Sequence, residues 1–483
     1  MKKSFILTAA IILSMAWSMN LCANDTIRMV WQGNGYKSIE ADVTSGTFYI
    51  DWGDGSAIQA ITPLGDDPPA SVSHIYSNAN TYTVTVSTAN SYCFLTVFGC
   101  DNGQVTSLDV SKSPRLTELS SFNNHQLTFL NISNNPRLKF LECSNNQLGT
   151  LDVSNNTQLQ YLVCGNNLLT SLDVSNNIQL RALSCDGNQL TSLDVSNNPQ
   201  LIDLSCASNP LSTLDIINNQ LLEGLHCSNN PLGTLDVSNN MQLRALSCDG
   251  NQLTSLDVSN NWRLEWLYCN NNQLSSLDVS NNPQLWSLKC FDNQFQLSDL
   301  YAAYQQTNNM YYTYLGTQRL PIQVALTDIP LFSSQTEFGG VSTKFYVEKG
   351  GVQADSAVDY IVNNGLVFLN VGNYTVTMTN VAIQSHPDYP AKVIVDITVD
   401  FNNGIVETDN YPSLRIYPNP ASEYLYVKLA EPQTADYNIY NIMGQIVKKG
   451  TLQGDDVINI SSLKKGTYFM KIAETTMKLV VND

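Results

Sequence analysis

Apolar residues return at fixed intervals through the middle of the chain. Eight copies of the pattern Leu-x-x-Leu-x-Cys-x-x-Asn-x-Leu follow one another, the last with Phe295 at the final position, and their cysteines stand 21 residues apart at 143, 164, 185, 206, 227, 248, 269 and 290. Each copy holds two short stretches of alternating apolar and polar residues, such as Leu141-Glu142-Cys143 and Leu151-Asp152-Val153, and asparagine follows each stretch. The alternation predicts strands and the asparagines predict turns. A fixed period of this kind predicts a stacked solenoid, because no single copy can bury its apolar side alone.

The same template extends toward the N-terminus. Leu95, Phe98 and Cys100 occupy its apolar positions, so the pattern predicts ten coils of 21–22 residues over 95–296. We expect a parallel strand on one side of each coil and a second extended segment on the other. At about 4.8 Å per strand, the stack is expected to be about 48 Å long.

The repeated cysteines are predicted to be buried, reduced thiols. In-register parallel strands hold neighbouring Cβ atoms about 4.8 Å apart and pointing the same way, whereas a disulfide needs them near 3.8 Å and facing each other. Zinc needs four ligands that converge on one point, and a straight ladder does not converge. Ser121 fills the equivalent position in the second coil, which favours packing over chemistry.

Two polar columns accompany the cysteines. Asparagines recur at 146, 167, 188, 209, 230, 251, 272 and 293, where each strand ends. Their amides can donate and accept, so we expect them to satisfy the backbone of the turns. Aspartates recur at 109, 152, 173, 194, 215, 236, 257 and 278 and are expected to point outward. They either bond to nearby serine, asparagine and backbone groups or bind calcium, although no glycine-rich calcium-binding nonapeptide accompanies them.

The N-terminus and the charge restrict where the chain acts. Residues 1–23 have two lysines, an apolar run and Ala23, which predict a cleaved signal peptide, with a lipoprotein start at Cys22 as the alternative. No later stretch is apolar enough to predict a transmembrane segment. The net charge is −18, and residues 104–296 hold 16 acidic and 8 basic side chains, which argues against nucleic acid as a partner. Cys93 lies outside the ladder and is expected to be buried or paired with Cys100.

Residues 24–94 are predicted to form a small β-sandwich. They contain Trp52-Gly53-Asp54-Gly55, then His74-Ile75-Tyr76 and the alternating run 82–86. This combination resembles the PKD-type immunoglobulin-like domain in a shortened form. We expect Asp51 and Asp54 to cap turns, because no third group stands beside them to make an acid–base pair.

Residues 297–405 are predicted to hold a short helical cap over 297–315 and a second immunoglobulin-like sandwich. The runs 321–326, 344–347, 374–378 and 393–399 alternate as strands, and a solenoid needs a cap over its last apolar face. Residues 402–410 read as a linker.

Residues 411–483 differ in composition, with 8 basic and 7 acidic residues. They contain Tyr417-Pro418-Asn419-Pro420, a Gly444-containing hairpin, Leu463-x-x-Gly-x-Tyr468 and Lys478-Leu479-Val480-Val481. The segment is similar to the type A C-terminal sorting domain of type IX secretion in Bacteroidetes. This resemblance implies contact with the type IX machinery, passage across the outer membrane, removal of the domain, and release or attachment at the cell surface of a Gram-negative bacterium. The residues alone predict an antiparallel sandwich with hairpins at Met443-Gly444 and Lys465-Gly466.

The central repeats resemble the leucine-rich repeats of bacterial surface and adhesion proteins, including the internalin-like kind. The overall prediction is therefore a mainly β chain, in which a leucine-rich repeat solenoid is flanked by small immunoglobulin-like β-sandwiches. The resemblance implies that ligands bind the exposed strand face. Positions that flank the inward Leu-x-Cys pair vary from coil to coil, so core packing does not dictate them. The candidate ligand-binding residues on this basis are Phe140, Tyr161, Trp262, Trp266, Tyr268, Trp286 and Phe291. The alternative for the C-terminal aromatic residues is that some pack under the cap.

The resulting hypothesis is a non-enzymatic, secreted or surface-displayed adhesion or binding protein for an extracellular protein or glycan. None of the four histidines has a nucleophile or metal-ligand spacing beside it, so the sequence predicts no cofactor and no metal site. A structural surface-layer or spacer protein is the alternative. The sequence leaves open the identity of the ligand, calcium binding and anchoring of the mature form.

Overall fold

The computed structural model describes residues 25–63, 68–90, 92–307, 312–327 and 330–400, and in the C-terminal segment 415–417, 421, 423–428, 434–441, 444–453, 456–472 and 475–481. The predicted signal peptide and the 402–410 linker lie outside these residues. The chain divides into two compact units. The first comprises Met1–Phe295, Ala302–Thr317 and Gln384–Pro390, and the second comprises Gln296–Tyr301, Gln318–Ile383 and Ala391–Asp483.

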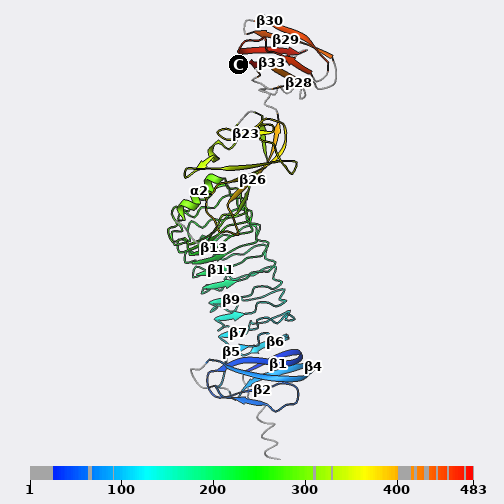
Figure 1. Cartoon of the computed structure of the whole chain (residues 1–483). Coiled ribbons are helices and arrows are strands. Elements are labelled where there is room, and N and C mark those ends of the chain that lie inside the picture. Colours follow the sequence, from blue (N-terminus) through cyan, green and yellow to red (C-terminus); the bar gives the residue numbers. More distant parts are fainter. Residues whose placement is uncertain are drawn as a thin grey trace, which may run out of the picture. The chain divides into compact units, whose positions relative to one another are not determined.

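The repeats form a solenoid of short parallel strands, which stack as rungs (Figure 1). Neighbouring rungs pair in register, as when Leu183 lies opposite Leu204, so each residue faces its counterpart in the next coil. Ten of the strands carry the repeat pattern and the eleventh, β16, follows a helix, so the predicted coil count is confirmed over the described residues. The strands are β5 (Leu95–Gly99), β7 (Glu118–Ser120), β8 (Phe140–Glu142), β9 (Tyr161–Val163), β10 (Ala182–Ser184), β11 (Asp203–Ser205), β12 (Gly224–His226), β13 (Ala245–Ser247), β14 (Trp266–Tyr268), β15 (Ser287–Lys289) and β16 (Tyr312–Tyr314).

The predicted inward residues form the core. In the coil of β8, Leu138, Leu141, Cys143 and Val153 are all fully buried. The cysteines from Cys93 to Cys290 are free and buried, and Cys93 points its thiol toward the carbonyl oxygen of Thr47. Residues 105–112 form β6 (Val105–Lys112), whereas the second halves of the later described coils hold no named strand and alternate unassigned residues with tight turns.

A column of asparagine side chains, one from each coil, forms hydrogen bonds between neighbouring coils. The side-chain amide of Asn167 donates to the carbonyl oxygens of Cys143 and Cys164, both 3.0 Å away, and its oxygen accepts the backbone N–H of Leu148. This column joins each coil to the one before it, as predicted. The residue before each such asparagine has a positive φ, 56° at Asn145 and 61° at Gly187, a conformation that asparagine and glycine tolerate better than other residues.

A second asparagine ladder runs through the other half of the coils. Asn198 donates to the carbonyl oxygens of Val174 and Asn177, 3.0 and 2.9 Å away. Its side-chain oxygen is buried and has no hydrogen-bond partner among the described residues, and the same holds along the column. The sequence analysis did not single out this column.

The N-terminal strands continue the same sheet. They are β1 (Thr26–Val43), β2 (Phe48–Asp51), β3 (Gln59–Ile61) and β4 (Ala70–Thr88). The long strands β1 and β4 pair antiparallel along most of their length, and the end of β1 pairs antiparallel with β5. Strand β1 therefore covers the first edge of the solenoid sheet, which protects that edge from pairing with other chains. The PKD-like assignment remains a prediction.

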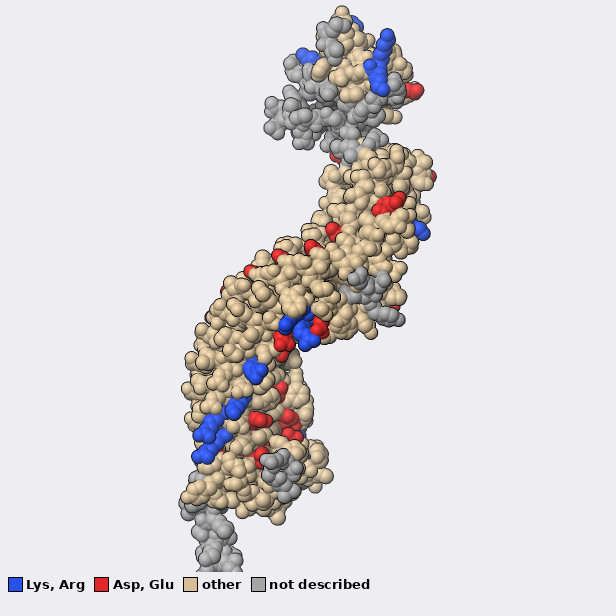
Figure 2. Space-filling model, turned by 90° about the vertical axis from the view of Figure 1, so that its left-hand side faces the viewer, with Lys and Arg blue, Asp and Glu red and all other residues tan. Residues whose placement is uncertain are grey.

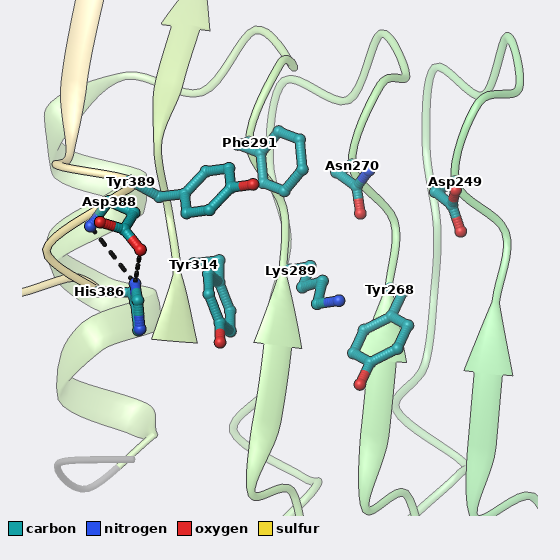
Figure 3. A pocket seen from close by; sticks show the side chains of 9 residues that line it. All are labelled: Asp249, Tyr268, Asn270, Lys289, Phe291, Tyr314, His386, Asp388 and Tyr389. Carbon is teal, nitrogen blue, oxygen red and sulfur yellow. Dashed lines mark hydrogen bonds and ion pairs between the residues drawn. The ribbon is translucent and has the colours of Figure 1, made fainter. Parts of the chain in front are cut away.

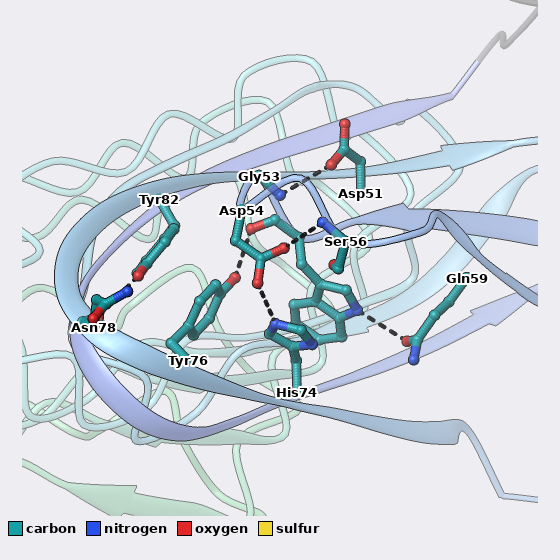
Figure 4. A network of polar contacts seen from close by, with 10 residues as sticks. Asp51, Gly53, Asp54, Ser56, Gln59, His74, Tyr76, Asn78 and Tyr82 are labelled. Atoms are coloured by element: carbon teal, nitrogen blue, oxygen red, sulfur yellow. Dashed lines mark hydrogen bonds and ion pairs between the residues drawn. The ribbon is translucent and has the colours of Figure 1, made fainter.

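A polar and aromatic network holds the turn after β2 (Figure 4). The carboxylates of Asp51 and Asp54 accept the backbone N–H groups of Gly53 and Ser56, at 2.9 and 3.0 Å, so both cap turns as predicted. Asp54 also lies 2.7 Å from the ring nitrogen Nε2 of His74, and hydrogen bonds from Ser56 and then from His74 lower the pKa of Asp54 to about 2. The buried ring of Trp52 stacks on His74. These contacts give Trp52, Asp54 and His74 a structural role, which is to hold the turn after β2.

The second unit contains the predicted strands of the 297–405 segment. One sheet has the order β17-β26-β25-β21-β22 with β18 beside β26, and two small hairpins, β19-β20 and β23-β24, accompany it. The bounds are β17 (Thr317–Arg319), β18 (Gln323–Leu326), β19 (Glu337–Phe338), β20 (Val341–Ser342), β21 (Lys344–Lys349), β22 (Val352–Gln353), β23 (Tyr360–Val362), β24 (Leu366–Phe368), β25 (Gly372–Thr379) and β26 (Lys392–Asp400). The helical cap predicted over 297–315 is too long: α2 spans Leu297–Gln306, and Tyr312–Tyr314 form β16 of the solenoid sheet instead. Gln306 accepts the backbone N–H of Val279.

The C-terminal segment forms two antiparallel sheets that share one core. The sheets are β27-β28-β31 and β30-β29-β32-β33, and Leu425, Ile439 and Met470 are among the buried residues between them. Strands β29 and β30 pair antiparallel on either side of Gly444, as the predicted hairpin requires, and Met443 lies outside the described residues. The predicted hairpin at Lys465-Gly466 is wrong, because β31 and β32 belong to different sheets and this turn crosses from one to the other. The bounds are β27 (Arg415–Tyr417), β28 (Tyr424–Lys428), β29 (Thr434–Asn441), β30 (Ile446–Gln453), β31 (Asp456–Asn459), β32 (Gly466–Ile472) and β33 (Thr475–Val481).

Candidate binding face

The rungs present two outward positions each. In β8 the side chain of Leu141 is buried, whereas Phe140 and Glu142 on either side of it are partly exposed. Because strands alternate and the rungs are in register, the outward positions form continuous columns along the sheet. Charged side chains are sparse on the face of the molecule in Figure 2, where most of the surface is uncharged.

Three aromatic side chains form a continuous row on the C-terminal rungs. The ring centroids of Trp266 and Trp286 lie 5.2 Å apart, those of Trp286 and Tyr312 lie 5.6 Å apart, and both contacts are edge-to-face. Trp286 and Tyr312 keep 43% and 44% of their surface exposed. We call Trp266, Trp286 and Tyr312 the aromatic row. Sequence reasoning named its two tryptophans and missed Tyr312, whose strand follows the helix and breaks the repeat.

The other predicted residues fall in three places. Phe140 and Tyr161 make a separate ring contact, at 6.4 Å, on β8 and β9. Trp262 lies in the turn before β14, where its ring packs against the guanidinium of Arg263 at 4.8 Å, so the structure does not bring it to the aromatic row. Tyr268 and Phe291 line a cavity beside the row.

This cavity has a volume of about 420 Å³ and lies wholly in the first unit (Figure 3). We call it the tyrosine cavity. Its lining comes from three successive rungs, from β16 and from a loop of residues 384–390: Asp249, Tyr268, Asn270, Lys289, Phe291, Tyr314, His386, Asp388 and Tyr389. Its volume lies in the range of ligand-binding pockets, roughly 300–1,000 Å³.

The loop 384–390 follows β25 and precedes β26 in the sequence, and it contacts the last rung. The backbone N–H of His386 donates to the carbonyl oxygen of Thr313 at 2.9 Å, and the hydroxyl of Ser385 donates to the same oxygen at 3.2 Å. Tyr389 packs on Phe291 with ring centroids 4.9 Å apart. None of the four histidines was predicted to have a functional neighbour, so the place of His386 in the cavity wall was not predicted.

The aspartate column lies elsewhere on the coils and serves the turns. Asp173 accepts the backbone N–H of Ser175 at 2.9 Å, and its equivalents do the same for the residue two positions later. The hydroxyl and the N–H of Ser175 together lower the pKa of Asp173. The aspartates therefore make the bonds to serine that were predicted as one of two alternatives. Over the described part of the chain, no cluster of three or more His, Cys, Asp or Glu side chains is placed to hold a metal ion.

The C-terminal segment matches a known family. Residues 415–482 fit the secretion system C-terminal sorting domain. A type IX sorting domain implies secretion of the chain or its attachment to the outer surface. Among the described residues, no helix combines the length and the apolar character that crossing a membrane requires.

Solved structures similar to this chain include three bacterial proteins. The functional domain of InlJ from Listeria monocytogenes, described as including a cysteine ladder, is 29% identical over 61% of this chain and 69% of that chain, with a TM-score of 0.49. InlP from Listeria monocytogenes is 20% identical over 63% of this chain and 88% of that chain, with a TM-score of 0.42. YopM, a leucine-rich effector protein from Yersinia pestis, is 25% identical over 41% of this chain and 55% of that chain, with a TM-score of 0.36. No curated protein matches the chain.

Proposed function

We propose that this chain is an exported, non-enzymatic binding protein of a Bacteroidetes-type bacterium, which holds an extracellular protein or glycan on the strand face of its solenoid. The aromatic row carries the proposal. Large aromatic side chains that stay exposed in a fixed geometry are what binding hot spots are made of, because they contribute contact area and lose little conformational entropy.

The surroundings of the row support this reading. Glu265, next to Trp266, forms an ion pair with Arg244 of the preceding coil at 2.5 Å. A charged rim around an apolar centre is the usual anatomy of a binding surface. The asparagine ladders hold the rungs in register, so the row is preorganised before a ligand arrives.

Export supports the extracellular setting. The sorting domain is the signal for delivery, and the expected course is passage across the outer membrane, removal of residues 411–483, and release or attachment at the surface. The solenoid is the part that then meets a ligand.

The middle coils favour a second role, that of a spacer. Their outward positions hold small residues, among them Ala182, Ser184, Ser205, Ala245 and Ser247, which offer no anchor for a partner. A structural surface-layer or spacer protein without a tight ligand is therefore the alternative function.

The deciding experiment is a screen of the purified chain against extracellular matrix proteins and a glycan array, with and without a chelator. For any ligand found, replacing Trp266 and Trp286 with alanine should weaken binding at least about tenfold. Trp262→Ala is the matched control, because that tryptophan is 49% exposed but lies off the row. The aspartates are occupied by turn N–H groups, so the chelator should have no effect.

Unchanged adherence of the double variant to cells or matrix would favour the spacer. Turnover of a polymer by the purified chain would contradict the non-enzymatic assignment.

A further inference from the structure

The tyrosine cavity contains a cation whose charge no carboxylate neutralises. The Nζ atom of Lys289 lies 4.2 Å from the ring centroid of Tyr268 and 5.5 Å from that of Tyr314. None of the ion pairs in the described part of the chain involves Lys289. The rings attract the ammonium group through their faces, but they accept no hydrogen bond as strong as that of an anion.

Neither of the two carboxylates that line the cavity forms an ion pair with Lys289. Asp249 accepts a hydrogen bond from the hydroxyl of Ser228 at 2.6 Å. Asp388 lies 3.7 Å from ring nitrogen Nδ1 of His386. Figure 3 shows both away from the ammonium group of Lys289, which points along the sheet toward Tyr268. The cavity therefore offers an incoming ligand one unclaimed positive charge.

An asparagine amide in the same wall is open to a ligand. Asn270 is only 6% exposed and lines the cavity, and its side-chain amide makes no hydrogen bond to any described residue. Figure 3 shows Asn270 and Tyr268 on one coil, beside the coil that carries Lys289. Neither its amide oxygen nor its amide nitrogen is among the buried unpartnered atoms of the described residues, so both are open to the cavity, where they can accept from and donate to the hydroxyls of a ligand.

The remaining walls are aromatic. Tyr268, Tyr314, Phe291 and Tyr389 surround the polar groups, so a ligand meets ring faces and phenol hydroxyls together. A ligand that fits this lining has an apolar face, several hydroxyls and one negative charge. We propose that the tyrosine cavity binds a carboxylated saccharide residue, such as a uronic or sialic acid, with its carboxylate on Lys289 and its hydroxyls on Asn270.

This inference rests on the proposed function, because it assigns a ligand class to the same strand face. An acidic peptide carries the same charge, but peptides often bind a sheet by adding a strand to its edge. Here the edge strand β16 is already covered, since the loop 384–390 bonds to its backbone at Thr313. A cavity of about 420 Å³ fits a single ligand unit better than an extended strand.

The test is isothermal titration calorimetry of the full chain with trigalacturonate and sialyllactose. Their neutral counterparts, galactotriose and lactose, are titrated alongside, as is a Glu-Asp hexapeptide. We expect one of the two acidic saccharides to bind at least about tenfold more tightly than its neutral counterpart and than the peptide. Lys289→Met should abolish that preference, and Lys289→Arg should retain much of it. Asn270→Ala should weaken both the acidic saccharide and its neutral counterpart.

Lys139→Met is the matched control, because Lys139 is an exposed lysine just before β8, far along the solenoid from the cavity. It should bind as the unchanged chain does, and thermal unfolding of each variant shows that it is folded. Equal binding of acidic and neutral saccharides, tighter binding of the peptide, or binding unaffected by Lys289→Met would overturn the assignment and leave the proposed function standing if the aromatic row still binds its ligand. Absence of binding by every probe here and every ligand in the wider screen would overturn both.

Discussion

The imidazole of His386 stacks on the phenol ring of Tyr314, with ring centroids 4.6 Å apart and an angle of 23° between the planes. In the sequence, Tyr314 precedes and His386 follows the strands β17 to β25. Their contact, with the hydrogen bonds of Ser385 and His386 to Thr313, makes the loop 384–390 the wall of the last rung.

Removing one hydroxyl should loosen this wall. Ser385 accepts the N–H of Leu315 at 3.0 Å, and its hydroxyl lies 2.5 Å from the carbonyl oxygen of Tyr389 and 3.2 Å from that of Thr313, so its one proton serves these two acceptors. Ser385→Ala removes all of these contacts. We expect faster amide hydrogen exchange in residues 312–317 and 384–390, measured by mass spectrometry. Ser175→Ala, in a central coil, should leave exchange in both segments unchanged, and unchanged exchange in Ser385→Ala would show that the ring contacts alone hold the loop.

The two asparagine ladders should differ in their contribution to stability. Asn209 makes three buried hydrogen bonds, to the carbonyl oxygens of Cys185 and Cys206 and from the N–H of Leu190. Asn198 makes only the two bonds of its N–H groups. Asn209→Ala should therefore lower the free energy of unfolding by about 3 kcal/mol or more, and Asn198→Ala by less, in urea denaturation. Equal losses would mean that the oxygen of Asn209 contributes nothing.

The cysteine column predicts a stabilising substitution. Ser121 is fully buried in that column, and its hydroxyl has no hydrogen-bond partner among the described residues. A thiol is less costly to bury than an unpaired hydroxyl, so Ser121→Cys should stabilise the chain by about 1 kcal/mol. The reverse change, Cys206→Ser, should destabilise it by about 1–3 kcal/mol. If Ser121→Cys is neutral or destabilising in thermal unfolding, the coil around Ser121 is shaped for the smaller atom.

The thiols of the repeated cysteine column should be unreactive in the folded chain. Burial raises the pKa of Cys206 to about 12 and that of Cys290 to about 12, and only the thiolate is reactive. A disulfide exchange reagent at pH 8 should therefore label none of the ladder cysteines in the folded protein and all of them in guanidinium chloride. Rapid labelling of Cys290 in the folded state would reveal local opening of the last coil.

The aspartate column predicts loss of stability in acid. Hydrogen bonds from the serine two positions later lower the pKa of Asp152, Asp173 and Asp194. A group whose pKa is lowered on folding stabilises the fold above its unfolded pKa, near 3.9 for aspartate, and this contribution disappears as the pH falls through the folded pKa. The melting temperature should thus stay level from pH 7 to about 5 and fall below about pH 4. Ser175→Ala should move the NMR titration of Asp173 upward, and an unmoved titration would assign the shift to the backbone N–H alone.

Sequence reasoning succeeded where every contact joins one coil to the next. The pairing of Leu183 with Leu204 repeats at every rung, so one period fixes the register, the buried cysteines and the asparagines that cross between coils. The same logic placed Trp266 and Trp286 on the outside of the sheet.

It failed where the partner comes from a distant segment. Nothing in the residues around His386 or Tyr389 signals that this loop packs on Tyr314 and Phe291, because the contact depends on the path of the chain through the second unit. The prediction that Trp262 joins the binding face failed for a different reason. Trp262 lies in a turn of its own coil, where its ring packs against Arg263 and away from the aromatic row. The turn at Lys465-Gly466 has a hairpin composition, but the pairing of β31 with β28 sends it across the sandwich instead.

The in-register pairing of identical rungs has a consequence for how this molecule can change over generations. Coils between β8 and β13 contact only copies of themselves, so duplication or deletion of one unit there alters length and leaves both ends of the sheet as they are. The final coils have no such freedom, because the loop 384–390 fits one specific terminus. Relatives of different size are therefore expected to vary in their central copies and to retain the last three.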